Sequence, residues 1–166
     1  MKTSWKRSVS YSLKKLITSV VFFFLWRALR SLYTMDSRIR EEMDSWPQNF
    51  TLHMQAGLGG PHLTIGMTPS GPVRLSGWET AQVHIRFKTL DSAFKLVTGQ
   101  LGVKQAYAEH RFSLSGDIAP TMSFVRCVEI SEAYLFPAFI THRILRAIPS
   151  KERSSLAVYR CVLFGF

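Results

Sequence analysis

Residues 83–128 read VHIRFKTLDSAFKLVTGQLGVKQAYAEHRFSLSGDIAPTMSFVRCV, and their hydrophobic pattern changes period several times. The first five residues alternate apolar and polar side chains, which is typical of a strand buried on one side. Helical spacing follows, with Asp91 as the expected N-cap and Gly99 at the expected C-terminal end. A short helix over 103–109, a short strand and a long helix after its N-cap Asp117 complete the stretch. This order of strands and helices predicts an α+β domain.

Three more strand patterns precede this stretch. Apolar and polar residues alternate over 50–54, 63–67 and 73–75, and the turn sequences GLGGP and TPSGP separate them. Tight turns between successive strands predict an antiparallel meander with one dry face. Together the patterns predict a five-stranded, mainly antiparallel sheet that helices cover on one face.

Helical patterns flank the predicted sheet on both sides. A short polar helix is expected over 36–45, and an amphipathic helix over 137–148. We therefore expect three segments in the chain. They are a basic, apolar N-terminal helix within 1–33, a folded domain over 34–149 and a C-terminal tail over 150–166.

The N-terminal helix is expected over residues 10–32, where apolar residues recur at spacings of three and four. Its uncharged stretch, 16–26, is eleven residues long. A transmembrane helix needs about 20, so we expect no membrane-spanning anchor. Arg27 and Arg30 stand where a signal peptide would have its cleavage site, so a cleaved signal is not expected either.

Two interpretations of this helix remain open. It packs on the domain, which we favour slightly, or it lies in a membrane interface as an amphipathic helix. In the second case the residues expected to contact the membrane are Lys14, Lys15, Phe22, Phe23, Phe24 and Trp26.

Charge is distributed unevenly along the chain. The net charge is +10, of which residues 1–30 carry +7 without any acidic residue. Residues 48–136 carry only +1, so the folded part is nearly neutral between basic ends. This distribution favours an anionic membrane surface over nucleic acid as a partner. We expect a cytoplasmic protein, peripheral to the membrane in the second interpretation, with Cys127 and Cys161 as reduced thiols.

The stretch over about 80–130 resembles the sterol carrier protein type-two family of sterol-transfer domains. The helix that ends in Thr98-Gly99-Gln100-Leu101 is similar to the family's Thr-Gly-Lys-Leu-like turn, and the pair Ala106-Tyr107 is similar to its Ala-aromatic pair. A strand from Arg111-Phe112 to Gly116-Asp117 and a helix with Met122 follow in the family's order. The sequence departs from the family at Gln100, where a Lys is usual, and at AEHRF, where a Gly-Lys pair is common.

This resemblance implies a sheet and helices that enclose an apolar tunnel. It implies a non-catalytic protein that binds or transfers a sterol-like, acyl or prenyl lipid. Accessory proteins of ubiquinone biosynthesis in the same superfamily also carry an Arg-aromatic strand before Gly-Asp. An alternative role is therefore an accessory factor that presents a lipid substrate to partners in a biosynthetic complex.

Given the resemblance, ten residues are the expected lining of the tunnel: Phe87, Phe94, Val97, Leu101, Tyr107, Phe112, Leu114, Met122, Val125 and Phe139. Phe112 and Leu114 are expected on the dry side of their strand, with Ser113 and Ser115 on the other. The same apolar residues could instead form a solid core. The five histidines show no paired ligand spacing, so neither a metal site nor a cofactor is expected. No GxSxG motif surrounds either serine, and no catalytic residue is expected.

Overall fold

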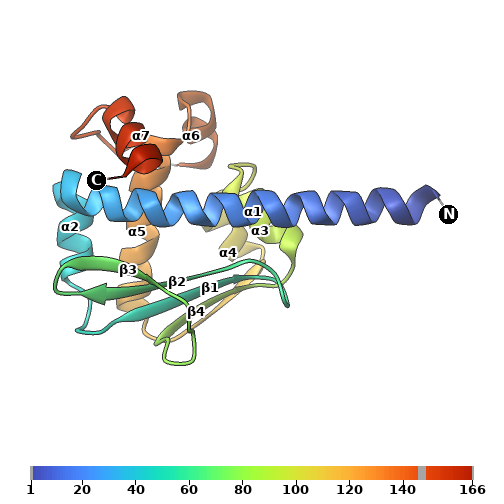
Figure 1. Cartoon of the computed structure of the whole chain (residues 1–166), viewed down its shortest axis with the longest axis horizontal. Coiled ribbons are helices and arrows are strands. Elements are labelled where there is room, and N and C mark those ends of the chain that lie inside the picture. The colour runs from blue at the N-terminus through green and yellow to red at the C-terminus, as the bar shows by residue number, and fades with distance from the viewer. Residues whose placement is uncertain (1, 146–148, 166) are drawn as a thin grey trace.

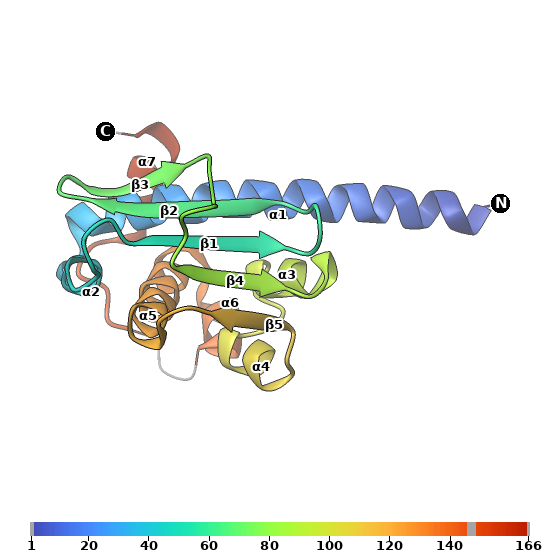
Figure 2. The same cartoon turned by 90° about the horizontal axis from the view of Figure 1, so that it is seen from below.

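A five-stranded sheet with the order β3-β2-β1-β4-β5 lies at the centre of the fold (Figure 2). The computed structural model describes residues 2–145 and 149–165. The strands are β1 Thr51–Ala56, β2 His62–Thr68, β3 Gly71–Leu75, β4 Val83–Phe87 and β5 Phe112–Ser115. The helices are α1 Lys2–Met35, α2 Ser37–Asp44, α3 Leu90–Val97, α4 Val103–Ala108, α5 Ile118–Leu135, α6 Ala138–Ile144 and α7 Ser155–Phe164.

The sheet is mixed but mainly antiparallel, as the sequence predicts. β1, β2 and β3 form the expected meander, and β4 pairs with β5 antiparallel. The chain then differs from a simple meander, because β4 crosses to the free edge of β1 and pairs with it in parallel. The register sets Leu52 opposite Val83 and Met54 opposite Ile85, and these four apolar side chains belong to the same hydrophobic core as residues of the helices.

Local capping explains where the helices begin, with one correction. Asp117 caps α5 as expected, since its carboxylate accepts a hydrogen bond from Ala119 N at 2.9 Å. Thr89, not Asp91, caps α3: its hydroxyl accepts from Ser92 N at 3.1 Å. Thr89 has the extended backbone of an N-cap, whereas Asp91 already lies in the first helical turn. Gly99 adopts φ +69° directly after the C-cap residue, where its lack of a Cβ avoids strain.

Helix α1 is longer than expected, and its two halves differ. Its N-terminal half projects beyond the sheet, while its C-terminal half lies against the sheet and against α5 and α7 (Figure 1). Phe22 and Leu29 of the C-terminal half are 2% and 0% exposed. Packing on the domain is thus the correct interpretation of that half.

The burial of α1 also bears on whether this helix spans a membrane or lies on its surface. Residues 10–35 are long and apolar enough to cross a membrane, although the core helix of a soluble protein and a signal sequence meet the same criterion. One third of that apolar window is buried inside the protein. Phe22 and Trp26, expected at a membrane, are buried in the hydrophobic core instead.

The C-terminal part differs most from the sequence prediction. The helix expected over 137–148 is the shorter α6, and residues 146–148 lie outside the described residues. The segment expected as a tail contains α7, which Ser154 caps by accepting from Ala157 N at 3.3 Å. Val158 and Val162 of α7 join the same hydrophobic core as α1 and the sheet. The three segments expected from the sequence therefore share one core.

Candidate functional site

An apolar cavity of about 320 Å³ lies between four helices, α1, α3, α5 and α7. We call it the α1–α7 cavity. Its size falls within the range of small-molecule sites. It is lined by Val21, Phe24, Leu25, Leu96, Val97, Val128, Glu132, Leu135, Phe136, Tyr159, Val162 and Leu163.

Helical spacing brings these side chains to one place. On α5, Val128, Glu132 and Leu135 follow one another at steps of four and three, which places them on one face of the helix. Tyr159 and Val162 show the same spacing on α7. Each helix thus contributes one stripe to the wall, and together the stripes enclose a space that no single element could form.

Glu132 is the exception in this apolar wall. Its side chain is only 8% exposed, and it forms no hydrogen bond or ion pair with any residue that the structure describes. Burial, and secondarily the nearby Glu129 carboxylate, raise the pKa of Glu132 to about 8. The carboxyl is therefore protonated at neutral pH and can donate one hydrogen bond and accept another.

The other titratable side chain in the wall is already engaged. The Tyr159 hydroxyl donates to the carbonyl oxygen of Leu135 at 2.6 Å. This bond satisfies the hydroxyl and fixes the tyrosine ring against the end of α5. Among the lining residues within the described ranges, Glu132 therefore remains the one ionisable group without a hydrogen bond.

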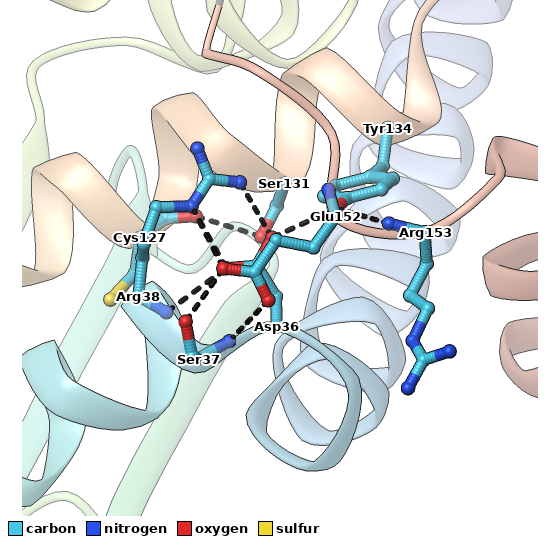
Figure 3. Close-up of polar contacts among 8 residues, drawn as sticks. All are labelled: Asp36, Ser37, Arg38, Cys127, Ser131, Tyr134, Glu152 and Arg153. Atoms are coloured by element: carbon cyan, nitrogen blue, oxygen red, sulfur yellow. Dashed lines mark hydrogen bonds and ion pairs between the residues drawn. The ribbon is translucent and has the colours of Figure 1, made fainter.

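A buried polar network fixes the segment that leads into α7 (Figure 3). The Tyr134 hydroxyl donates to the Asp36 carboxylate at 2.8 Å and accepts from the backbone N–H groups of Glu152 and Arg153. Arg38 donates to the same carboxylate through Nη2 at 2.6 Å. Burial alone would raise the pKa of Asp36, but the hydrogen bonds from Arg38 and Tyr134 outweigh it and lower the pKa.

The Glu152 side chain completes this network, which we call the Glu152 latch. Its carboxylate accepts from Ser37 N at 2.9 Å and from Ser37 Oγ at 2.6 Å, at the N-terminus of α2 (Figure 3). Towards the other end of α7, the Arg27 guanidinium donates to the Val162 carbonyl oxygen. Helix α7 is thus held on two sides while it covers the cavity.

A larger hollow of about 530 Å³ lies at the surface between α2 and α5. Charged side chains dominate its lining, among them Glu42 and Arg126, whose ion pair is 2.5 Å long. Such a surface offers little apolar contact. We therefore place the candidate site in the smaller α1–α7 cavity.

The residues expected to line a tunnel are distributed over several environments. Val97 lies in the wall of the α1–α7 cavity. Phe87, Leu101 and Phe112 are buried, Phe94 and Val125 are half-buried, and Tyr107, Met122 and Phe139 are exposed. Leu114 shares the helix-covered face with Phe112, as expected, but it is 37% exposed because β5 is an edge strand.

The sequence patterns do not identify most of the residues that line the α1–α7 cavity. The pattern of α1 predicts contact with a membrane or with the core, and the segment that contains α7 is expected to be a tail. One signal is present: Glu132 falls on the apolar stripe of its helix, four residues after Val128. A carboxyl group in such a stripe indicates a buried acid.

Three histidines gather on the opposite face of the sheet, beside Trp78. The His53 ring lies 5.7 Å from that of His62 and 5.9 Å from that of His84, measured between centroids. Burial and then these two neighbours lower the pKa of His53 to about 4. No group of three potential ligands among the described residues has the arrangement of a metal site.

No protein-family model matches this chain, and no curated protein does. Three solved structures are similar to it. The structure named UbiJ-SCP2 ubiquinone synthesis protein is 15% identical over 75% of this chain and 99% of its own, with a TM-score of 0.44. Sterol carrier protein 2 like 2 from Aedes aegypti is 16% identical over 58% of this chain and 94% of its own, with a TM-score of 0.36.

The third structure is a conserved hypothetical protein of Thermus thermophilus, suggested to be a sterol carrier protein. It is 14% identical over 79% of this chain and 90% of its own, with a TM-score of 0.44. Because the identities and TM-scores are low, conclusions about function rest on the cavity of this chain.

Proposed function

We propose that this protein is a non-catalytic lipid carrier that holds an apolar lipid in the α1–α7 cavity. The observation that carries the proposal is a cavity of about 320 Å³ with an almost wholly apolar wall. A solid core would leave little space of this size, because protein interiors are close-packed. An apolar ligand would fill the space and restore the missing contacts.

The energetics favour such a ligand. Each buried methylene is worth about 0.8 kcal/mol, so a chain of ten gains roughly 8 kcal/mol from desolvation. Ordering the ligand offsets several kcal/mol of this gain. The remainder corresponds to reversible binding, which is what a carrier requires.

The wall offers no constellation for catalysis among its described residues. Glu132 is protonated and lacks a neighbouring base or nucleophile, and the Tyr159 hydroxyl is bonded to the backbone. A general acid needs a partner group within hydrogen-bond reach of the reacting atoms. Binding is therefore the function that the wall supports best.

Two measurements test the proposal. Native mass spectrometry of protein purified from its own host should show a bound lipid, which solvent extraction then identifies. Purified protein should also move a pyrene-labelled acyl lipid from donor to acceptor vesicles. Lipid-free protein without saturable binding of acyl or prenyl probes would contradict the proposal. Stable binding without transfer would favour the alternative, in which the protein presents a lipid to partner enzymes.

A further inference from the structure

We propose that the Glu132 carboxyl is the polar anchor of the α1–α7 cavity, and that its ligand is a neutral lipid with a hydroxyl or carbonyl oxygen at its head. This inference rests on the proposed lipid-carrier function and deepens it. It names the class of head group and the residue that recognises it.

The first step is the burial of Glu132 without a partner. Glu132 is 8% exposed and lines the cavity, and no hydrogen bond joins its carboxyl to another described residue. Its oxygens are not among the fully buried unbonded atoms of the described residues, so the carboxyl is open to the cavity. Buried polar groups in native proteins are almost always hydrogen-bonded, because an unpaired one loses its hydration without compensation. An unpaired carboxyl in the wall of an apolar cavity therefore indicates that its partner belongs to the ligand.

The second step is the charge around the carboxyl. The lining side chains from α1 and α3 are all apolar, and α7 contributes Tyr159, whose hydroxyl donates to Leu135 O. On α5 itself, Glu129 adds negative charge one turn before Glu132, and it pairs outward with Lys104 at 3.3 Å. None of the lining residues that the structure describes is a cation.

Three basic groups on the packed helices are committed elsewhere. Arg27 of α1 donates to the Val162 carbonyl oxygen. Lys14 of α1 and Lys95 of α3 both pair with Asp91. The described lining thus offers no counter-ion for a fatty-acid carboxylate, which would have to be buried there as an unpaired charge.

The third step is the chemistry of a protonated carboxyl. It donates through its O–H and accepts through its carbonyl oxygen, so it matches a hydroxyl group in both directions and a carbonyl group in one. Such a bond in an apolar setting orients the lipid with its head at Glu132 and its apolar body along α1, α3 and α7. Ionisation of Glu132 removes the donor that a carbonyl head group needs, so binding of a carbonyl-headed lipid should weaken as pH rises through about 8, whereas a hydroxyl can still donate to the carboxylate.

The test uses the full chain and three pyrene-decyl probes that differ only in their end group: methyl ketone, carboxylate or methyl. Each probe partitions between phosphatidylcholine vesicles and the protein, which corrects for differences in solubility. At pH 6.5 the wild type should prefer the ketone probe over the methyl probe by roughly tenfold, the worth of one hydrogen bond. At pH 9.5 this preference should disappear, because an ionised carboxylate has no proton to donate to a carbonyl oxygen.

Two variants separate recognition from packing. Glu132→Gln retains a neutral donor and should keep the ketone preference at both pH values. Glu132→Leu should bind the methyl probe at least as well as the wild type and lose the ketone preference. If either variant fails to fold, the pH dependence of the head-group preference of the wild-type protein tests the anchor by itself.

The outcomes distinguish this inference from the function on which it rests. Wild-type protein that takes up none of the probes overturns the lipid-carrier function itself. Uptake of all three with equal affinity, or a ketone preference that is the same at pH 6.5 and 9.5, refutes the anchor and leaves the carrier function intact. Tightest binding of the carboxylate probe overturns the neutral head group.

Discussion

At the scale of single residues, Glu132 makes the stability of the ligand-free protein depend on pH. Its pKa rises from 4.5 to about 8 on folding, so between these values the folded state holds a proton that the unfolded state has lost. Stability therefore falls as pH rises from about 4.5 to about 8 and stays low above that. The loss amounts to at most about 5 kcal/mol, and less where water reaches the carboxyl.

Replacing Glu132 by Gln should remove this dependence. We expect Glu132→Gln to be more stable than the wild type at pH 9 by a few kcal/mol, and nearly equal to it at pH 4. Urea unfolding of the lipid-free protein at both pH values measures the difference. Glu129→Gln, one turn away and paired with Lys104 at the surface, is the matched control and should shift stability by less than about 1 kcal/mol. A wild-type stability that rises from pH 5 to 9, with Glu132→Gln following it in parallel, contradicts this account.

At the scale of secondary-structure elements, patterns local in the sequence were predictable. The alternation in β1, β2 and β4, the Asp117 cap and the Gly99 terminus each depend on a few neighbouring residues. The choice between Thr89 and Asp91 as the cap of α3 was not predictable, because both residue types cap helices and only the backbone geometry separates them.

The candidate site could not be predicted in the same way, because it depends on tertiary contacts. Four helices far apart in the sequence form its wall, and α7 belongs to a segment whose sequence predicts a tail. The periodicity of an apolar helix shows that it buries a face, but not against which element. Glu132 was detectable as an acid in an apolar stripe, yet its cavity was not.

The position of α7 depends on the Glu152 latch, which gives an element-scale prediction. Glu152→Ala removes the acceptor of two hydrogen bonds from Ser37. We expect faster hydrogen exchange in α7, a dissociation rate of bound lipid that rises several-fold, and a small loss of stability. The exposed neighbour Arg153 keeps its backbone bond to Tyr134 when its side chain is truncated, so Arg153→Ala is the control. Unchanged exchange in α7 of the Glu152 variant would show that the latch does not hold the helix.

The projecting half of α1 gives a second prediction at this scale. Tyr11, Leu13 and Leu16 are large apolar residues exposed on it, and the exposed Val20 and Phe23 follow in the other half of the helix. We propose that this half attaches to an anionic membrane surface, where each nearby basic residue adds about 1 kcal/mol that salt screens.

Flotation with phosphatidylserine-containing liposomes tests this attachment. The double variant Leu13→Glu, Leu16→Glu should lose binding, because it puts two charges where acyl chains would lie. Leu58→Glu, at a fully exposed turn position, is the control and should bind like the wild type. These substitutions are preferable to deletion of residues 1–32, since Phe22 and Leu29 belong to the core. Equal flotation of all three proteins, or no weakening at high salt, would rule out the attachment.

At the scale of the whole molecule, the remaining question is where a ligand lies. The sequence places it around Leu114 and Met122, which are 37% and 44% exposed near the edge of the sheet. The structure offers the α1–α7 cavity, with Val128 in its wall. Val128 and Met122 belong to the same helix, α5, so one pair of substitutions can compare the two locations.

We expect Val128→Trp to fill the cavity and block lipid uptake, and Met122→Trp to leave uptake unchanged. A large side chain added to a solid core costs about 1–3 kcal/mol through strain, whereas a cavity of about 320 Å³ accepts it with little change in Tm. Probe partitioning from vesicles and thermal melting, done on both variants, measure the two effects.

Lost uptake with a retained Tm for Val128→Trp places the ligand between α1, α3, α5 and α7. Lost uptake for Met122→Trp alone would move the ligand to the edge of the sheet near β5. A sharp fall in Tm for Val128→Trp, with uptake retained by the molecules still folded, would mean that the helices close into a solid core and that lipid is held elsewhere.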